Sequence, residues 1–483
     1  MSVVRKVSGR SSRVLCGSGW SAGLVSSLAL GSLTLLTACS DGEDVTLPTG
    51  GSDDVANPGG SNDPNVATGP TFHGDVAPIF NAKCTGCHRE GGIGPFLLTE
   101  YEPAHDRAMQ IASYTAERVM PPFLIETGGE CGSFDESVAL TDAEIATIGE
   151  WARAGAPEGT PTALVPHPLP VLENGQDFDL PMFEPQVAGD ALAEFDEYRC
   201  FPVEHELASN QYVTGYDVLP GNPSIVHHVL AFIVDPNRVV QDGRTNAQVM
   251  QALDDESPDR LGWPCFGMAG DGVDVDSVPV IWAPGQGVVD YPNGLGVSFP
   301  QDRVLVAQVH YNLADGAPPG ATDQTKVRMR LADSVERQGI FVLDDDLLNT
   351  LFSEQPHLLP AGQESVKFEW TRRLGDVGIP DDLDLDLVGL FPHMHGLGHK
   401  YTFEVSNGGG EFECQGRVNR WDFNWQRIYD YAAPVPVNAD TQFRVTCDYD
   451  TRRVTQDVLP GWGTRNEMCF VMTMLALPPG VFF

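Results

Sequence analysis

From about residue 178 to the C-terminus, the chain consists of short runs rich in Val, Phe, Leu and Tyr that are interrupted by Gly, Pro, Asn and Asp. The run Val304–Asn312 is strand-like, and residues 383–388 alternate Leu with Asp, as in a strand with one solvated face. This pattern favours all-β sandwiches. A stretch of about 300 residues exceeds what one sandwich core usually needs, so we expect two sandwiches.

Residues 71–165 have a helical pattern instead. The clearest helix follows a capping box formed by Thr141 and Glu144, its apolar residues recur at helical spacing, and Gly155 ends it. A proline-rich stretch at 157–170 follows as a linker. The chain therefore predicts a small helical domain ahead of the β part.

Residues 1–38 have the character of a targeting segment. A basic start is followed by apolar and small residues, and the segment ends in LTAC at 36–39, which resembles a bacterial lipoprotein signal with Cys39 as the acylated residue. The alternative is a transmembrane anchor, although the apolar run is short and rich in Ser and Gly. In both cases the body of the protein lies outside the cytoplasm, behind a flexible, acidic tether at 39–70.

The charge balance excludes one class of partner. The chain has 29 Lys and Arg against 67 Asp and Glu, a net charge of −38. Nucleic acid is therefore excluded as a partner, because phosphate binding needs clustered Lys and Arg. The length of 483 residues fits about three domains of roughly 150 residues each.

The haem-attachment motif Cys84-Thr85-Gly86-Cys87-His88 lies in the helical region. Its two thiols add to the haem vinyl groups, and the adjacent His is placed to bind the iron. The alternative is a redox dithiol or half of a zinc site.

Residues 74–155 resemble a small c-type cytochrome, and residues 119–123 match the loop that supplies its second axial ligand. The resemblance implies that Met120 is this ligand, with His105 as the competing choice. A His and Met pair raises the haem potential, which suits an electron carrier.

Six scattered residues downstream are of types that ligate copper: His227, His228, His310, His393, His395 and Met468. Imidazole suits copper, and a thioether favours Cu(I). Residues i and i+2 share a strand face, so His393 and His395 point together while Met394 is turned away. A regular strand would point His227 and His228 apart. They can share a metal only at a bulge, at a strand end or through different ring nitrogens.

These residues stand in four short motifs: SIVHH at 224–228, QVHY at 308–311, HMHG at 393–396 and EMC at 467–469. In type and order the motifs resemble the copper type II, ascorbate-dependent monooxygenases, over about residues 195–483. The resemblance implies two jelly-roll-like β-sandwich copper domains that face each other across a solvent-filled cleft. It also implies two copper ions and hydroxylation of a substrate C–H bond with dioxygen.

The resemblance assigns the ligands to two coppers. His227, His228 and His310 would hold the electron-transfer copper. The catalytic copper, which binds dioxygen, would be held by His393, His395 and Met468.

The extracytoplasmic location permits disulfides. Of ten cysteines, Cys16 leaves with the signal, and the lipid and haem sites take three more. The six that remain could pair in many ways. The resemblance implies Cys200–Cys265 and Cys447–Cys469, which leaves Cys131 and Cys414 to pair with each other by elimination or to stay free. That third bridge would tie the cytochrome to the second copper domain.

Two departures from the family bear on electron supply and substrate. The haem suggests a fused cytochrome that takes electrons from an external donor, either ascorbate or a periplasmic carrier. Where the peptide-processing branch has an Arg that grips a substrate carboxylate, this chain has Phe391, and Phe470 and Met472 stand where that branch has polar residues. We therefore expect a small apolar or aromatic substrate, with amines among the candidates.

The expected organisation is a cytochrome c-like haem domain at 71–165 and copper β-sandwiches at 178–335 and 336–483, with one covalent haem c and two copper ions. The alternative is a non-catalytic copper or electron-transfer lipoprotein, which predicts the loss of a ligand such as Met468 or His310. All six ligands are present. A haem peroxidase would usually need a second haem motif, and the sequence has one.

Overall fold

The computed structural model describes residues 69–483 apart from several segments, and the described residues belong to one compact unit. The segments left out are 91, 93, 136–137, 163–170, 187–195, 241–242, 267, 285, 293, 314–319 and 344–356. The expected targeting segment, Cys39 and most of the tether lie outside the described residues.

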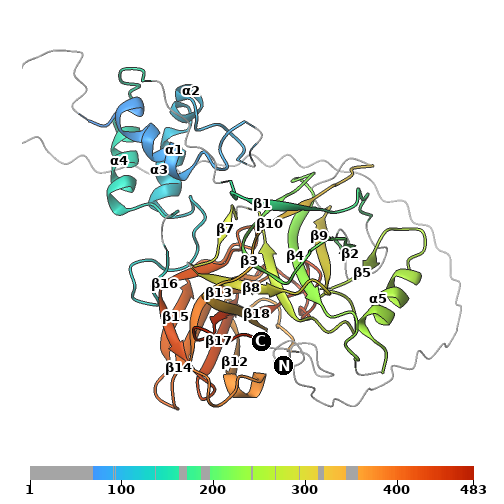
Figure 1. The fold of residues 1–483 in the computed structure, drawn as a ribbon. Coiled ribbons are helices and arrows are strands. Elements are labelled where there is room, and N and C mark those ends of the chain that lie inside the picture. Colours follow the sequence, from blue (N-terminus) through green and yellow to red (C-terminus); the bar gives the residue numbers. More distant parts are fainter. Residues whose placement is uncertain are drawn as a thin grey trace, which may run out of the picture. The chain divides into compact units, whose positions relative to one another are not determined.

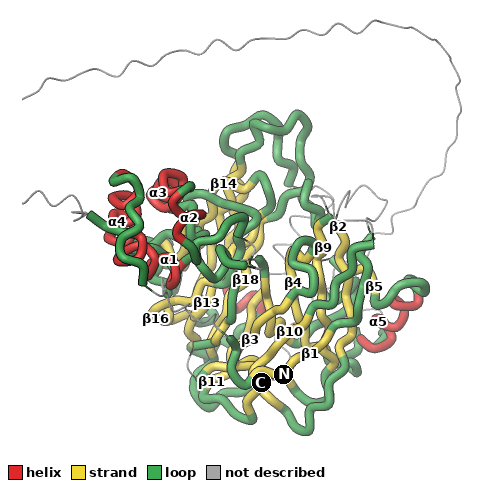
Figure 2. Tube along the Cα trace, turned by 90° about the horizontal axis from the view of Figure 1, so that it is seen from above, coloured by secondary structure: helices red, strands yellow, loops and turns green. Residues whose placement is uncertain are grey.

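The N-terminal part of the described chain is helical, as the sequence predicts (Figure 2). Its helices are η1 (Phe72–Val76), α1 (Ala77–Lys83), α2 (Tyr101–His105), α3 (Ala108–Ala116) and α4 (Asp142–Arg153). The predicted capping box starts α4, because the Thr141 side chain accepts from the Glu144 amide while the Glu144 carboxylate accepts from the Thr141 amide. Gly155 follows the helix with a φ of 84°, which favours glycine. Phe72 and Trp151 are fully buried in the core that these helices share.

Three sheets make up most of the remainder (Figure 1). A five-stranded sheet has the order β5 (Trp263–Pro264), β2 (Asp196–Val203), β9 (Val304–Asn312), β4 (Val226–Val234) and β6 (Ser277–Trp282). A four-stranded sheet has the order β12 (Val366–Arg373), β17 (Gln442–Tyr449), β14 (Gly398–Ser406) and β15 (Glu413–Val418). The nine-stranded sheet has the order β1 (Gly175–Asp179), β10 (Lys326–Ala332), β3 (Gln211–Leu219), β8 (Leu295–Phe299), β11 (Arg337–Leu343), β18 (Cys469–Ala476), β13 (Leu385–Met394) and β16 (Tyr429–Val437), with β7 (Val289–Asp290) paired to β3. The remaining elements are the helices α5 (Asn246–Asp255) and η2 (Leu374–Val377).

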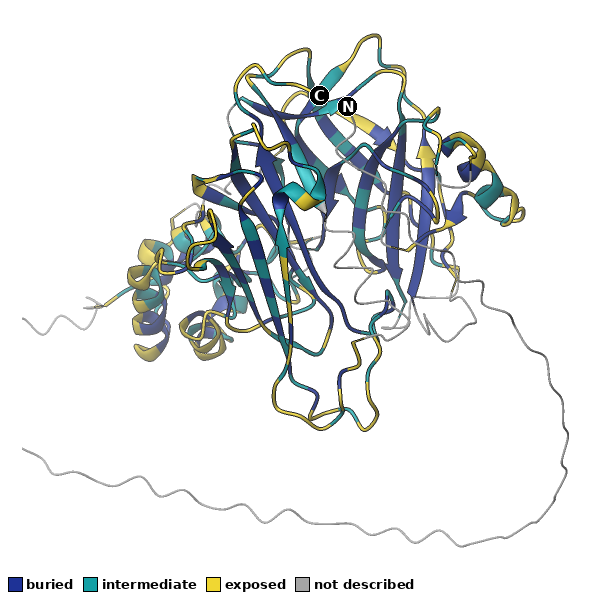
Figure 3. Ribbon diagram, turned by 90° about the horizontal axis from the view of Figure 1, so that it is seen from below, coloured by how far each residue is buried: buried dark blue, intermediate teal, exposed yellow. Residues whose placement is uncertain are grey.

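The sheets enclose apolar cores. In Figure 3 much of the length of the strands is dark blue, the colour of buried residues. One core contains Val213 of β3 and Val229 of β4. A second core contains Phe403 of β14, Val445 of β17 and Leu475 of β18. Along β17 buried and partly exposed residues alternate, which is the period of a strand with one face toward a core. The predicted mostly-β architecture is therefore confirmed, and the three sheets are consistent with the expected β-sandwiches.

Strand β11 joins the two expected copper domains into one sheet. It pairs in parallel with β8, which precedes the expected boundary at 335, and antiparallel with β18, which follows it. The nine-stranded sheet consequently contains strands from both sides of this boundary. The domain limits themselves stay predictions.

Among the described residues the structure has three disulfides, and they are the three expected pairs: Cys131–Cys414, Cys200–Cys265 and Cys447–Cys469. The first joins the segment between α3 and α4 to β15. Isolated β-bridges flank this disulfide, one from Ile125 to Val418 and one from Phe134 to Tyr431. The segment that leads away from α3 is thus attached to β15 and β16 by backbone pairing as well as by a covalent bond.

Among the described residues, no helix combines the length and apolarity that a membrane crossing requires.

We expect non-reducing peptide mapping to recover Cys131 and Cys414 in one cross-linked fragment. The bridges that flank this pair hold the two backbones together, and loss of such a disulfide typically costs about 2–5 kcal/mol of stability. The Cys200–Cys265 fragment in the same digest serves as the internal control. Alkylation of both Cys131 and Cys414 before reduction would show that this bridge is absent in the purified protein.

Candidate metal centres

Two neighbouring strands of the five-stranded sheet, β4 and β9, bring three histidines together. His228 pairs with His310 across these strands, and the register shifts between Val226 and His228. The shift allows the consecutive His227 and His228 to turn toward the same partner. Of the arrangements that would let this pair share a metal, a bulge, a strand end or different ring nitrogens, the register shift corresponds to the first.

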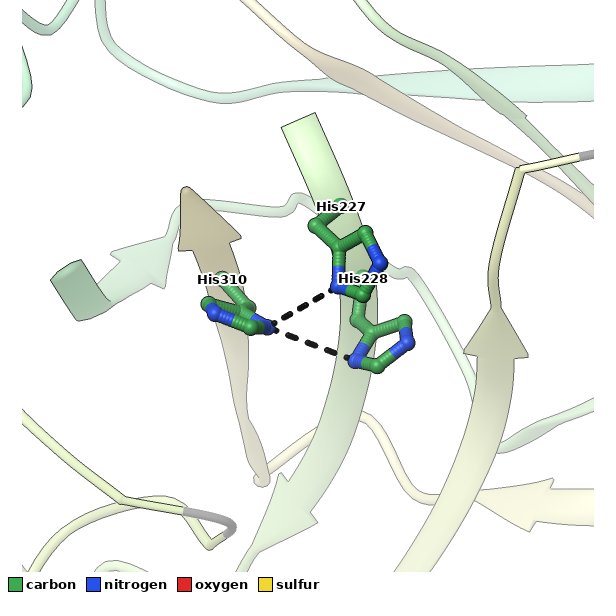
Figure 4. A group of neighbouring side chains, drawn as sticks. All are labelled: His227, His228 and His310. Carbon is green, nitrogen blue, oxygen red and sulfur yellow. Dashed lines mark hydrogen bonds between the residues drawn. The ribbon is translucent and has the colours of Figure 1, made fainter. Parts of the chain in front are cut away.

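The three imidazoles converge through the same ring atom (Figure 4). The Nδ1 atom of His310 lies 3.3 Å from Nδ1 of His227 and 3.4 Å from Nδ1 of His228. One potential ligand atom from each histidine lies within 4.8 Å of the other two. This donor set fits a transition metal that prefers imidazole, and copper is one such metal.

The far nitrogen of His310 is held by a carboxylate. Nε2 of His310 lies 3.1 Å from Oδ1 of Asp196, and both side chains are almost completely buried. Burial alone would raise the pKa of Asp196, but hydrogen bonds from His310 and Thr464 outweigh it and hold this pKa below its ordinary value. The Tyr198 ring stacks on His310 with centroids 4.0 Å apart. His310 is thereby fixed in orientation with Nδ1 free for a metal.

A second pair of histidines stands at the end of β13. The ring centroids of His393 and His395 are 5.1 Å apart, whereas Met394 between them is fully buried in the core. Nδ1 of His395 lies 3.0 Å from the carbonyl oxygen of Asn466, and Nδ1 of His393 contacts Oε1 of Gln426. Both rings therefore keep Nε2 available, and their shared face is the one that the alternation predicted.

Met468 lies beside this pair. The register of β13 and β18 pairs Met394 with Cys469, so Met468 is adjacent to His395 one step further along. The carboxylate of Glu467 accepts hydrogen bonds from the amides of His395 and Met468, which ties the two backbones together. Met468 is 2 % exposed. The structure thus brings all three expected ligands of the second copper to one place.

Burial favours the uncharged form of four of the candidate ligand histidines, His227, His228, His393 and His395. It is the main cause that lowers the pKa of His227 and His228 well below the usual value, and neighbouring histidines lower it further. Burial likewise lowers the pKa of His393 to about 3 and of His395 to about 4. Copper binds the neutral imidazole, so these side chains need not lose a proton at neutral pH before they bind a metal.

The surroundings of His88 are compatible with the axial role expected for it. Nδ1 of His88 lies 3.0 Å from the carbonyl oxygen of Phe96, which leaves Nε2 for the iron. Cys84 and Cys87 are free thiols. Burial raises the pKa of Cys84 to about 12, opposite to the shift that a reactive redox dithiol needs. In the described part of the chain, no metal-binding group of side chains includes these cysteines. The donor set fits haem better than it fits a dithiol or zinc site.

Met120 and His105 occupy different surroundings. Met120 lines a cavity of about 500 Å³ between the helices and the loop that contains Arg420, and the described residues of the haem motif are not part of this lining. The His105 side chain is 42 % exposed and lies next to Asp106. Met120 stays the predicted sixth iron ligand, with His105 as the alternative.

Three residues that hold the ligand histidines in place, Asp196, Gln426 and Glu467, were not predicted from the sequence. Asp196 and Gln426 contact histidines that are far away in sequence, and neither residue belongs to a ligand motif. Glu467 stands inside a motif, but its pairing with the amide of His395 depends on the strand register. Only the tertiary contacts identify these partners.

Comparison with known proteins supports one family. Residues 347–476 match the model of the copper type II ascorbate-dependent monooxygenase, C-terminal domain, a range that contains His393, His395 and Met468. This match and the two relatives described next support the copper type II monooxygenase family, whose members are oxidoreductases.

The relatives are distant. The chain is 21 % identical over 274 residues to tyramine beta-hydroxylase of Caenorhabditis briggsae, which covers 55 % of this chain and 41 % of the relative. It is 23 % identical over 276 residues to dopamine beta-hydroxylase of Rattus norvegicus, which covers 56 % of this chain and 40 % of the relative. This chain therefore spans less than half the length of either curated relative.

Among solved structures, the major capsid protein P2 from bacteriophage PM2 matches with a TM-score of 0.24 and 8 % identity, over 64 % of this chain and 100 % of that chain. A similarity at this level carries no argument about the present fold.

We expect Asp196→Asn to weaken copper binding at the three-histidine cluster by roughly 10–100-fold, the usual effect of removing a partner of a metal-bound histidine. Competition with a chromophoric Cu(I) chelator at fixed pH measures the affinity. Asp196 accepts hydrogen bonds from both His310 and Thr464. Thr464→Val removes the bond from the Thr464 hydroxyl and leaves the bond from His310, so it shows which of the two contacts matters for copper affinity. Asp179→Asn, which alters an exposed side chain, is the control. Wild-type affinity in Asp196→Asn would show that the carboxylate does not support the site.

Proposed function

We propose that this chain is a copper-dependent monooxygenase that hydroxylates a C–H bond of a small apolar or aromatic substrate with dioxygen. Two clusters of side chains carry the proposal. The Nδ1 atoms of three histidines converge in the first cluster. His393, His395 and Met468 lie on adjoining stretches of β13 and β18 in the second. Bound copper would supply one-electron storage at each site and a place to activate dioxygen, and hydroxylation needs two electrons. Burial lowers the pKa of His227, His228, His393 and His395 and so keeps them neutral. Hydrogen bonds orient His310, His393 and His395.

Apolar side chains next to the second cluster support the choice of substrate. The Phe391 ring lies parallel to that of His393, with centroids 6.3 Å apart, and the Phe470 ring lies 6.2 Å from it. Met472 pairs with Phe391 across β13 and β18 and is buried. None of these three side chains can grip a carboxylate. Because two distant relatives are named for tyramine and dopamine, aromatic amines are the first substrates to test.

The test of this proposal is metal content followed by product analysis. After reconstitution, elemental analysis should give two coppers per chain, and a pyridine haemochrome assay should give one covalent haem. Incubation with ¹⁸O₂, ascorbate and a panel of aromatic amines should yield an alcohol that carries one ¹⁸O atom. One copper or fewer per chain would reject the two-site proposal. Two coppers without a labelled product would favour the non-catalytic copper protein.

We also propose that a haem held by Cys84, Cys87 and His88 passes electrons to the copper sites from an external donor, either ascorbate or a periplasmic carrier. A haem held there would supply electrons one at a time, and each electron that it gave up would reduce one Cu(II) held by the histidine clusters to Cu(I). The sequence motif and the bond from His88 to the Phe96 carbonyl support the haem.

Side-chain contacts between the segment after Met120 and the loop beside both histidine clusters support the second half of this route. The ring of Phe123, three residues after Met120, lies 5.3 Å from that of Tyr429. The guanidinium of Arg427 lies over both rings, 5.7 Å from Phe123 and 5.9 Å from Tyr429. Arg427 follows Gln426, whose side chain contacts histidines of both clusters. The Cys131–Cys414 disulfide anchors the same segment.

If haem feeds copper, stopped-flow mixing of pre-reduced, copper-loaded protein with dioxygen and substrate should reoxidise the haem. In copper-free protein the haem should stay reduced much longer. Cys87→Ala, which removes one attachment thiol, should abolish turnover driven by the external carrier and spare turnover driven by excess ascorbate. Reoxidation at the same rate with and without copper would show that the cytochrome serves another partner.

We propose further that the protein lies outside the cytoplasm, attached to a bacterial membrane through a lipid on Cys39. The LTAC sequence at 36–39 and the three disulfides, which need an oxidising compartment, support this location. In cells fed radioactive palmitate, the wild-type protein should become labelled and Cys39→Ala should not. Equal labelling of both forms would contradict the lipid site.

A further inference from the structure

One carboxylate near the candidate copper ligands has no partner. Asp430 of β16 pairs with Gly389 of β13 and is partly buried. In the part of the chain that the structure describes, its carboxylate accepts no hydrogen bond and forms no ion pair. Burial raises the pKa of Asp430 to about 6, so most of this carboxylate is ionised at neutral pH. A buried charge without a partner is costly, and the position therefore favours a ligand that brings donors and a positive charge.

Arg427 does not take this role. Its guanidinium lies over the ring of Tyr429, 5.9 Å from the ring centroid. Consecutive residues of a strand point to opposite faces, so the side chains of Tyr429 and Asp430 point apart. The positive charge of Arg427 lowers the pKa of Asp430 only in part, against the larger effect of burial.

Two tyrosines of the other sandwich core lie near this carboxylate. Burial raises the pKa of Tyr216 and of Tyr291, and the negative charge of Asp430 adds to the rise in both. The packing agrees, because the Tyr291 ring lies 6.4 Å from that of Phe341 in β11. Phe341 pairs with Met474 of β18, and Met474 pairs with the β13 residue opposite Asp430.

The hydroxyls of these tyrosines are bonded elsewhere. Tyr216 donates its hydroxyl hydrogen to the carbonyl oxygen of Ile281 at 2.6 Å. Tyr291 donates its own to the carbonyl oxygen of Pro279. Neither hydroxyl is left to donate to Asp430.

A second acceptor without a donor lies at the Tyr216 hydroxyl. The side-chain nitrogen of Gln286 donates to the Tyr216 oxygen at 3.0 Å. Because the Tyr216 hydrogen goes to Ile281, its oxygen can only accept from Gln286, which identifies the nitrogen of this amide. The other amide atom, Oε1 of Gln286, is buried and has no hydrogen-bond partner among the described residues, and Gln286 is 6 % exposed. Asp430 and Gln286 thus offer two acceptors that lack donors near one hydroxyl.

The carboxylate also shares a sheet face with a candidate copper ligand. Gly389, Phe391 and His393 alternate along β13 and so point to one face, and Asp430 stands opposite Gly389 on that face. A Cβ atom at position 389 would lie 3.8 Å from Oδ1 of Asp430, so a larger side chain there would cover the carboxylate. The four residues from Gly389 to His393 span roughly 13 Å of strand, and a hydrogen bond takes up about 3 Å of it. A molecule about 10 Å long fits this interval.

We infer that Asp430 and Gln286 bind the ammonium group of an amine substrate whose remaining part extends along β13 toward His393. The inference rests on the proposed copper function and deepens it, because it names the residues that select a cationic substrate. An alkylammonium group has three N–H donors and a positive charge, so it can satisfy the carboxylate and the amide oxygen together. An alcohol of the same shape has one donor and no charge.

Calorimetry of the copper-free full chain can compare 4-phenylbutylamine, which has about the required length, with its neutral counterpart 4-phenylbutanol. Asp430→Asn removes the charge and keeps the shape, and Gln286→Met removes the unpartnered oxygen. Asp135→Asn is the matched control, because Asp135 is an exposed carboxylate whose charge also acts on Asp430. This control separates a bound ammonium from a general effect of negative charge.

We expect the wild-type chain to bind the amine at least tenfold more tightly than the alcohol. Asp430→Asn should abolish this difference, Gln286→Met should reduce it, and Asp135→Asn should keep it. In copper-loaded protein, Asp430→Asn should raise KM for the amine and leave KM for the alcohol unchanged. If Asp430→Asn does not fold, as judged by circular dichroism, Asp430→Ala must show the same loss.

Equal affinity of the wild-type chain for amine and alcohol would overturn the ammonium site and leave the copper proposal intact. Equal losses in Asp430→Asn and Asp135→Asn would overturn it as well. An amine-selective site in a chain that holds fewer than two coppers would instead overturn the copper proposal, because the calorimetric measurement does not depend on copper.

Discussion

A hydrogen bond at the ring nitrogen that points away from the metal orients most of the candidate ligand histidines. An imidazole has two nitrogens, and the one that is bonded elsewhere decides which is left for a metal. Asp196 plays this part for His310, Gln426 for His393 and the Asn466 carbonyl for His395. Without these partners the rings could rotate or change tautomer, and burial would hold neutral imidazoles that no longer converge. The candidate copper chemistry therefore depends on groups that never touch copper.

Asp196 and Tyr198, which contact His310 in the first cluster, also contact the loop that precedes Met468 in the second. Asp196 accepts hydrogen bonds from the amide and the hydroxyl of Thr464, at 3.0 and 2.9 Å, as well as from His310. Tyr198 stacks on His310 and donates its hydroxyl to the Trp462 carbonyl. Both contacts reach the loop that leads to Met468. A buried carboxylate is costly unless it is well bonded, and these donors satisfy Asp196. The position of the Met468 loop is consequently linked to the strand next to the first cluster.

Local patterns in the sequence predicted much of this arrangement. The capping box of Thr141 and Glu144 and the burial of alternate residues along β17 follow from interactions between residues a few positions apart. The adjacent pair His227 and His228 could share a metal at a bulge, at a strand end or through different ring nitrogens, and β4 has a register shift at this pair. The resemblance to a known family paired four cysteines, and elimination paired Cys131 with Cys414. The helix cap, the strand alternation and the histidine pair were thus contained in short stretches of chain, whereas the cysteine pairs needed the resemblance and a count.

By itself, then, the sequence determined the helical and β segments, the identity of the candidate ligands and the pairing of cysteines. The segments and the candidate ligands follow from side-chain periodicity and donor chemistry, whereas two cysteine pairs follow from the resemblance to a known family and the third from elimination. Only the tertiary structure decided that β11 joins strands of both expected copper domains in one sheet, and that the 421–428 loop lies against both clusters. It also decided that Asp196 and Gln426 serve the ligand histidines. The physical reason is that a hydrogen bond depends on the position and direction of two groups in space, and the fold brings together partners that no spacing along the chain relates.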